Sequence, residues 1–219
     1  MCCLRVNLPP VYPIVDGPLL RARELQLTTA AEALLEAGMR ILQFRWKDGY
    51  SREVFAEAQA IAGLCADCGA LLVVNDRIDV AMLLGSGAHI GQDDLPPAAA
   101  RKLLSTVPVL GLSTHNEEQF LAALQQPADY VALGPVFGTS SKLNPDPVVG
   151  TAELRRLAAL SALPVVAIGG ITRENVPEVW RAGARSAAVI GDLYPHEATK
   201  ASVRERAEEW MRIAHEHCG

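Results

Sequence analysis

The chain has 219 residues, half of them hydrophobic, with a formal net charge of −5. This size and composition predict one domain over residues 1–219, with residues 1–10 as a short N-terminal extension. The sequence has no run of Lys and Arg, no signal peptide and no apolar run near the roughly 20 residues that span a bilayer, so we expect a cytoplasmic protein that binds neither nucleic acid nor membrane.

The hydrophobic pattern predicts strands and helices in strict alternation. In chain order, the predicted strands cover residues 12–16, 40–47, 71–74, 88–90, 107–112, 129–133, 164–168 and 186–190. The predicted helices cover residues 30–37, 52–68, 78–82, 98–104, 117–124, 151–160, 173–182 and 199–215. This unbroken alternation predicts an α/β fold, a (β/α)8 TIM barrel with eight parallel strands. No G-x-G-x-x-G motif follows the first strand, so the usual signature of a dinucleotide-binding fold is missing.

Two carboxylates follow neighbouring strands in the segment 71–95. Asp76 comes just after the strand 71–74, and Asp94 follows the strand 88–90. Because the exits of parallel strands open on the same edge of a sheet, we expect Asp76 and Asp94 to meet there. Two unpaired carboxylates would repel, so a shared hard cation such as Mg²⁺ explains the pair. The alternative is that Asp76 caps the next helix and Asp94 starts a loop.

Three polar side chains alternate with aromatic ones in the strand 40–47. Gln43, Arg45 and Lys47 share one face, because successive side chains of a strand point to opposite sides. In a barrel covered by helices, that face points into the mouth. An amide and two cations at the mouth favour a polyanionic ligand such as a phosphorylated molecule.

Further polar groups and glycines follow the other strands. They are Asn75, Gln92, Ser113, His115, Thr139, Ser140, Ser141, Lys142, Gly169, Gly170 and Gly191. The glycines after the last two strands predict a second, neutral phosphate site formed by backbone N–H groups. Taken singly, each of these residues has an ordinary explanation as a cap, a turn former or a surface residue. His89 is interpreted as a hydrogen-bonded core histidine, and Cys65 and Cys68 are assigned to helix packing.

Several motifs, in this order, resemble those of the thiamine phosphate synthase family. They are YPIVD (12 to 16), QFRWK (43 to 47), VVNDRIDVA (73 to 81), HIGQDDLP (89 to 96), GLSTH (111 to 115), DYVALGPVFGTSSK (129 to 142), AIGGIT (167 to 172) and AAVIG (187 to 191). The resemblance implies a barrel enzyme that joins a hydroxymethylpyrimidine diphosphate to a thiazole phosphate, plain or carboxylated. Thiamine phosphate and pyrophosphate would be the products.

The resemblance also implies roles for individual residues. Contacts to the pyrimidine diphosphate would come from Gln43, Arg45, Lys47, Asn75, Ser113 and Lys142. Contacts to the thiazole phosphate would come from Thr139, Ser141, Gly170, Ile190 and Gly191, and the Mg²⁺ ligands would be Asp76 and Asp94. The chain departs from the family at three places: Gly191 stands where Ser is usual, Ser141 replaces Thr, and the loop 85–91 is one residue shorter. The shorter loop makes Asp93 an alternative to Asp94.

The predicted mouth contains no nucleophile with an assured base. We therefore expect a dissociative substitution in which Mg²⁺, Arg45, Lys47 and Lys142 stabilise the departing pyrophosphate, with Ser113 as a further catalytic residue. One alternative is a thiazole tautomerase-type paralogue in which His115 transfers a proton. Another is a non-catalytic barrel that only binds a thiazole phosphate. The sequence leaves the oligomeric state open.

Overall fold

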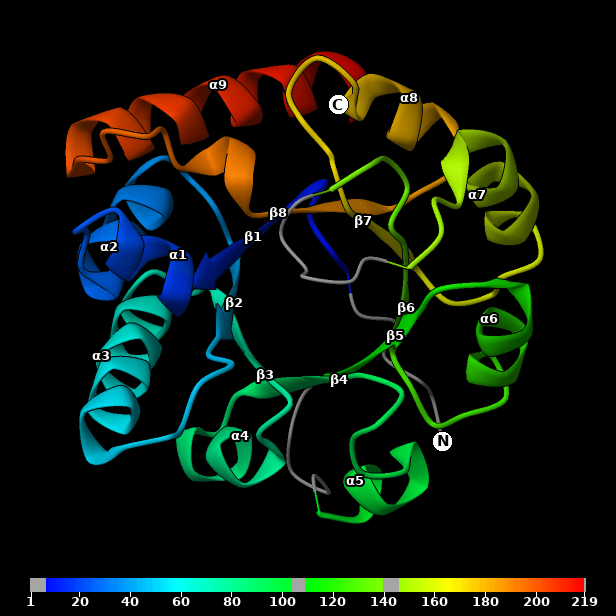
Figure 1. Cartoon of the computed structure of the whole chain (residues 1–219), viewed down its shortest axis with the longest axis horizontal. Coiled ribbons are helices and arrows are strands. Elements are labelled where there is room, and N and C mark those ends of the chain that lie inside the picture. The colour runs from blue at the N-terminus through cyan, green and yellow to red at the C-terminus, as the bar shows by residue number, and fades with distance from the viewer. Residues whose placement is uncertain (1–6, 104–108, 140–145, 219) are drawn as a thin grey trace.

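The structure, a computed structural model, describes residues 7–103, 109–139 and 146–218. Within these ranges eight parallel strands close into a barrel whose strand order equals the chain order (Figure 1). The strands are β1 Val11–Asp16, β2 Ile41–Arg45, β3 Leu71–Asn75, β4 Gly87–Ile90, β5 Leu110–Thr114, β6 Tyr130–Leu133, β7 Val165–Ile168 and β8 Ser186–Val189. The barrel closes where β1 pairs with β8, with Val11 opposite Ala187. The predicted (β/α)8 fold is confirmed.

Helices surround the ring of strands on its outer side (Figure 1). They are α1 Gly17–Ala22, α2 Leu27–Glu36, α3 Arg52–Asp67, α4 Ile78–Leu84, α5 Pro97–Leu103, α6 Glu117–Ala123, α7 Gly150–Ala158, α8 Val176–Arg181, α9 Lys200–Cys218 and the 3-10 helix η1 Gly191–Leu193. None of the described helices is both long enough and apolar enough to cross a membrane. Cys65 on α3 is buried against the barrel, whereas Cys68 after it is exposed.

The prediction of one helix between β1 and β2 was wrong, because α1 precedes α2. The side chain of Asp16 caps α1 by accepting a hydrogen bond from the Leu19 amide at 3.0 Å, and a proline stands at the start of the helix. Six residues are too few to show a helical period, so the hydrophobic pattern gave no signal for α1. Strand β5 also extends beyond its predicted end, so Ser113 lies inside the strand rather than after it.

The core has two layers, which follow from the alternation of side chains along the strands. Outward residues such as Val15 and Phe44 pack under the helices. Inward residues fill the barrel itself, among them Tyr12, Ile14 and Tyr130. Leu8, inside the predicted N-terminal extension, is 1% exposed and belongs to this inner layer. Residue 8 is therefore part of the barrel core.

Candidate functional site

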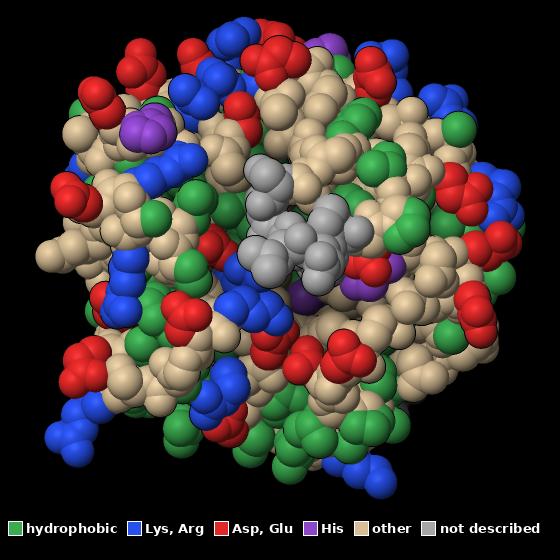
Figure 2. Space-filling view, viewed as in Figure 1, with side chains coloured by type: hydrophobic (Ala, Val, Ile, Leu, Met, Phe, Trp, Pro, Cys, Tyr) green, Lys and Arg blue, Asp and Glu red, His purple; other side chains and the backbone are tan. Residues whose placement is uncertain are grey.

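A cavity of about 680 Å³ lies at the carboxyl ends of the strands. Its lining includes predicted site residues from both sectors of the barrel mouth, namely Gln43, Arg45, Lys47, Asn75, Asp76, Asp94, Ser113, Thr139, Gly170, Ile190 and Gly191. The predicted residues Ser141 and Lys142 lie outside the described residues. On the face seen in Figure 2, Lys and Arg side chains lie beside acidic ones near the centre. The convergence predicted from strand periodicity is thus confirmed for every predicted residue that the structure describes.

Arg45 is held by a buried carboxylate. Its guanidinium group donates to Asp16 Oδ2, and Asp16 is only 5% exposed. The other oxygen of Asp16 caps α1, so the acid is fixed from two sides. Asp16 ends the first predicted strand, but the hydrophobic pattern alone does not indicate a role for it. A buried charge needs a partner, and this rule together with the pairing of Asp16 opposite Arg45 in the β1–β2 register identifies it.

Trp46 fixes the chain between Arg45 and Lys47. Its indole N–H donates to the Gly49 carbonyl at 3.2 Å. The guanidinium carbon of Arg21 lies 4.1 Å from the centroid of its ring, a cation–π contact. The segment that carries both predicted phosphate-binding cations therefore has a defined course.

We call the part of the cavity around Arg45 and Lys47 the cationic sector. Lys47 lies on its more exposed side, together with the carboxylates of Asp76 and Asp94. The Lys47 ammonium group lies 2.5 Å from Asp76 Oδ2. Asp76 has a φ of 62°, in the left-handed region that is uncommon for a residue with a side chain. The alternative that Asp76 caps α4 was wrong, because Arg77 is the N-cap residue and no side-chain cap bond is present at that helix start. Such a backbone conformation at a cavity is typical of functional positions.

Asp94 lies close to Asp76, as predicted for exits of neighbouring strands. Its Oδ2 atom accepts a hydrogen bond from the Gly91 amide at 2.7 Å. Burial and the neighbouring Asp76 carboxylate raise the pKa of Asp94 above its ordinary value. Asp93 also lines the cavity, but the carboxylate whose pKa Asp76 raises is that of Asp94. The shorter loop has therefore not removed Asp94 from the predicted pair.

Asn75 presents an unused donor beside these groups. The residue is 8% exposed, and its Nδ2 atom has no hydrogen-bond partner among the described residues. A buried amide N–H without a partner costs free energy, so the position suits a ligand atom that accepts a hydrogen bond.

His89 confirms the interpretation as a hydrogen-bonded core histidine, and it also reaches the cavity wall. Its Nδ1 atom lies 2.8 Å from Tyr130 Oη, and its Nε2 atom lies 2.8 Å from Ser113 Oγ. Burial lowers the pKa of His89 to about 4, so the ring is neutral near neutral pH. Sequence reasoning missed the contact with Ser113, although His89 and Gly111 are opposite each other in the β4–β5 register.

The glycine-lined sector is formed by the loops that follow β7 and β8, and β1 separates β8 from β2, the strand of Arg45, around the ring. Gly170 has a φ of +63° and accepts a hydrogen bond from Asn175 through its carbonyl oxygen at 3.0 Å. No atom of the described residues lies within 4 Å of the position where a Cβ atom on Gly191 would stand. Next to it, Asp192 also lines the cavity and accepts hydrogen bonds from Arg173 at 3.0 Å and from Trp210 at 2.9 Å. The sector is thus open at Gly191 and closely packed at Gly170.

Comparisons with known proteins agree with this geometry. The family model described as thiamine monophosphate synthase matches residues 11–193. The chain belongs to the thiamine monophosphate synthase family. The thiamine-phosphate synthase of Koribacter versatilis is 42% identical over 213 residues, which cover 96% of this chain and 98% of that protein. The enzyme of the same name from Chlorobium phaeovibrioides is 43% identical and covers 84% of this chain and 91% of its own.

Solved structures show the same relationship. The thiamine phosphate pyrophosphorylase from Pyrococcus furiosus superposes with a TM-score of 0.85 at 30% identity, covering 97% of this chain and 98% of that one. This member of the thiamine monophosphate synthase family is therefore an enzyme, a transferase of thiamine biosynthesis. The interpretation as a non-catalytic barrel was wrong.

Proposed function

We propose that the enzyme joins a hydroxymethylpyrimidine diphosphate to the ring nitrogen of a thiazole phosphate by dissociative substitution. The C–O bond between the methylene carbon and the diphosphate breaks first, and the electron pair leaves with pyrophosphate. The electron-rich aminopyrimidine stabilises the resulting cation, and the thiazole nitrogen then forms the new C–N bond. The observation that carries the proposal is the convergence of Arg45, Lys47 and two carboxylates on one cavity.

The two acids fit a bound Mg²⁺ ion. Among the described residues no group of three or more His, Cys, Asp or Glu side chains could hold a metal. Mg²⁺ is commonly bound through one or two carboxylates together with substrate phosphates and water, so Asp76 and Asp94 are a sufficient protein donor set. When bound there, the ion would neutralise charge on the diphosphate. Burial and the nearby Asp76 carboxylate raise the pKa of Asp94, and a cation bound there would favour its charged form.

The two ion pairs of the cationic sector suit different tasks. The Lys47–Asp76 pair is exposed, with 49% and 21% of the side-chain surfaces accessible, so exchanging its partners costs little. A bound diphosphate would therefore replace Asp76 as the partner of Lys47, and Asp76 would then be available to hold the metal ion. The Arg45–Asp16 pair is largely buried and stays in place, which holds the guanidinium group ready for the developing negative charge. Lys142 and Ser141, which the resemblance assigns to the same substrates, belong to this proposal as further contacts.

The test of the function is a coupled assay for thiamine phosphate formed from the two substrates. Pyrophosphate release in step with product is the expected result. His115 lines the same cavity, and its Nδ1 atom lies 2.8 Å from the Gly134 carbonyl oxygen. In the alternative tautomerase reaction, His115 would transfer the proton. We expect the His115→Ala variant to make thiamine phosphate at a near-normal rate. Proton exchange on the thiazole phosphate without any coupling would support the tautomerase alternative instead.

The metal assignment predicts a loss of Mg²⁺-dependent binding in the Asp76→Asn variant. Calorimetry of inorganic pyrophosphate binding, with and without Mg²⁺, should show a metal-dependent affinity in the unaltered enzyme. The affinity for pyrophosphate measured with Mg²⁺ should be lower in the variant by about tenfold or more, because one of two carboxylate ligands is gone. Asp79→Asn is the matched control, since Asp79 on α4 pairs with Arg77 and neither residue lines the cavity. An equal loss in both variants would contradict the assignment.

The open space at Gly191 predicts a gain of affinity in the Gly191→Ser variant. A serine side chain fits because its Cβ position has no neighbour within 4 Å in the part of the chain that the structure describes, and its hydroxyl can donate to a phosphate oxygen. The KM for the thiazole phosphate should fall about fivefold, with kcat unchanged. Gly191→Ala adds the carbon without the hydroxyl and should leave this KM as it is. A rise in KM for the serine variant would place the phosphate elsewhere.

A further inference from the structure

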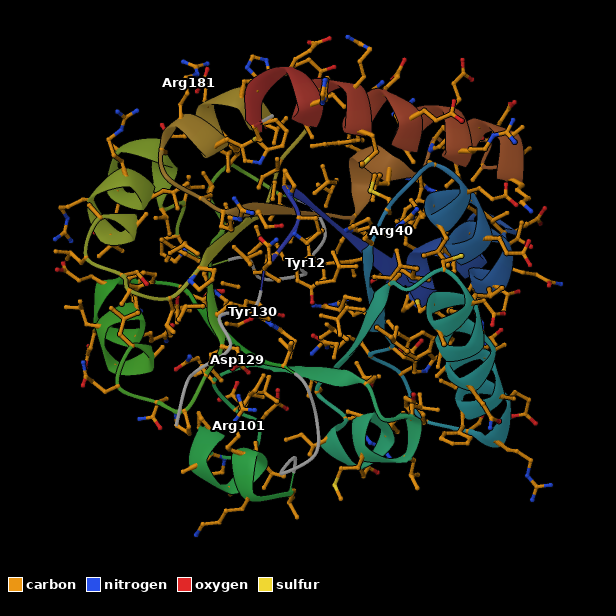
Figure 3. All side chains as sticks on the ribbon, turned by 180° about the vertical axis from the view of Figure 1, so that it is seen from behind. Tyr12, Arg40, Arg101, Asp129, Tyr130 and Arg181 are labelled. Atoms are coloured by element: carbon orange, nitrogen blue, oxygen red, sulfur yellow. The ribbon has the colours of Figure 1, made fainter. Side chains whose placement is uncertain are left out.

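A chain of hydrogen bonds crosses the inside of the barrel and joins two walls of the cavity. Gln43 Nε2 donates to Tyr12 Oη at 3.3 Å, and Tyr12 Oη lies 2.9 Å from Tyr130 Oη. Tyr130 Oη lies 2.8 Å from His89 Nδ1, and His89 Nε2 lies 2.8 Å from Ser113 Oγ. Figure 3 shows Tyr12 and Tyr130 within the ring of strands. Both ends of the chain are residues of the candidate site, and the three groups between them are buried.

The residues packed around this chain of hydrogen bonds leave the space that its side chains need. Gly111 on β5 leaves the room that the contact between Tyr130 and His89 needs. A Cβ atom there would stand 2.1 Å from Tyr130 Cζ and 2.5 Å from His89 Nδ1. The two rings stack with their centroids 5.5 Å apart. The hydrogen bonds therefore have a fixed geometry.

The direction of every bond in the chain follows from its two ends. The Gln43 amide N–H donates to the Tyr12 hydroxyl. Among the described residues the other hydrogen-bond partner of this buried hydroxyl is Tyr130 Oη, so in the relay Tyr12 uses its single hydrogen for Tyr130. The Tyr130 hydroxyl, which accepts from Tyr12, then donates its own hydrogen to His89 Nδ1. The same direction follows independently from acidity, because a phenol is a stronger hydrogen-bond donor than a serine hydroxyl. Because Nδ1 accepts the hydrogen of Tyr130, His89 carries its own proton on Nε2 and donates it to Ser113 Oγ.

We propose that Gln43, Tyr12, Tyr130 and His89 form a directional hydrogen-bond relay that fixes the Nε2–H tautomer of His89 and makes the Ser113 hydroxyl a donor toward the cavity. Its oxygen is occupied by the proton of His89, so its own hydrogen points to the ligand. The substrate atom that meets Ser113 is accordingly an acceptor. This consequence for the pyrimidine substrate rests on the proposed function, whereas the tautomer does not. Tyr12, Tyr130 and His89 are positioning residues that act through Ser113.

The tautomer is read directly by nitrogen NMR of the full chain labelled at its histidines, without ligand and at neutral pH. We expect one neutral His89 signal set with hydrogen on Nε2 and none on Nδ1, assigned by its loss in the His89→Gln variant. Hydrogen on Nδ1, or a charged ring, would overturn the relay. Because no substrate is present, this result is independent of whether the enzyme has the proposed activity.

Kinetics test whether the relay acts through Ser113. Tyr130→Phe should lower kcat/KM about tenfold, the value of one hydrogen bond in the transition state. In the Ser113→Ala background the same change should have almost no further effect. Tyr194→Phe is the matched control, since Tyr194 is equally buried but donates to the Ile14 carbonyl at 3.0 Å, outside the relay. Additive effects of Tyr130→Phe and Ser113→Ala would overturn the proposal, and the NMR measurement remains decisive if a variant does not fold.

Discussion

Replacing Arg45 with lysine should lower kcat about a hundredfold while the barrel stays folded. The lysine keeps a positive charge for Asp16, but it lacks the planar fork that binds a phosphate group through two N–H donors. Loss of one preorganised donor to developing charge costs about that factor. Steady-state kinetics of thiamine phosphate formation measures it, and the KM for the thiazole phosphate should stay the same.

The choice of lysine matters for the interpretation of this variant. Alanine at position 45 would leave the buried Asp16 carboxylate without its cationic partner, which typically costs about 3–5 kcal/mol of stability. Arg40→Lys is the matched control, because Arg40 precedes β2 at the opposite end of the barrel and donates to the Met39 carbonyl at 2.9 Å. A fall in kcat of the same size for Arg40→Lys would show that the effect is not local to the site.

Replacing Gly170 with alanine should lower the free energy of unfolding by about 3 kcal/mol and weaken thiazole-phosphate binding with it. The residue has a φ of +63°, and a Cβ atom would stand 2.4 Å from the Gly138 carbonyl oxygen and 2.8 Å from Phe137 Cβ. The backbone of one loop or the other must shift. Urea denaturation measures the stability, and the KM for the thiazole phosphate measures the binding.

Gly191→Ala provides the comparison for this prediction. Its added carbon meets open space, so its stability should change by less than about 0.5 kcal/mol. If both alanine variants unfold at the same urea concentration as the unaltered enzyme, the close approach at Gly170 does not constrain the loop.

Strand periodicity was sufficient to predict the barrel and most of the site. An alternating pattern decides which side chains face inward, and parallel strands place their exits on one rim, so Gln43, Arg45, Lys47, Asp76 and Asp94 could be grouped without coordinates. The helix α1 was missed because a six-residue helix introduced by a proline has no period to detect.

The internal partners of the site residues could not be predicted in the same way. Periodicity says that Tyr12, His89 and Tyr130 face inward or are buried, but not which of them touch across a barrel. That depends on the stagger between strands and on the room that a residue such as Gly111 leaves. The role of Asp16 could not be predicted for a related reason, because it depends on the ion pair that this residue forms with Arg45 across two strands.

Because β1 pairs with β8, the site combines residues from the beginning and the end of the barrel. Arg45 depends on Asp16 at the end of β1, and Gly191 follows β8, so the cationic and glycine-lined sectors stand on either side of the seam. An unclosed ring of seven strands would keep Arg45 and Lys47, the proposed diphosphate-binding cations, but would lack one wall of the proposed second phosphate site. We therefore expect catalytic turnover to require ring closure. A chain that ends before residue 186 lacks β8 and should have no turnover, even though every charged group of the first four strands is present.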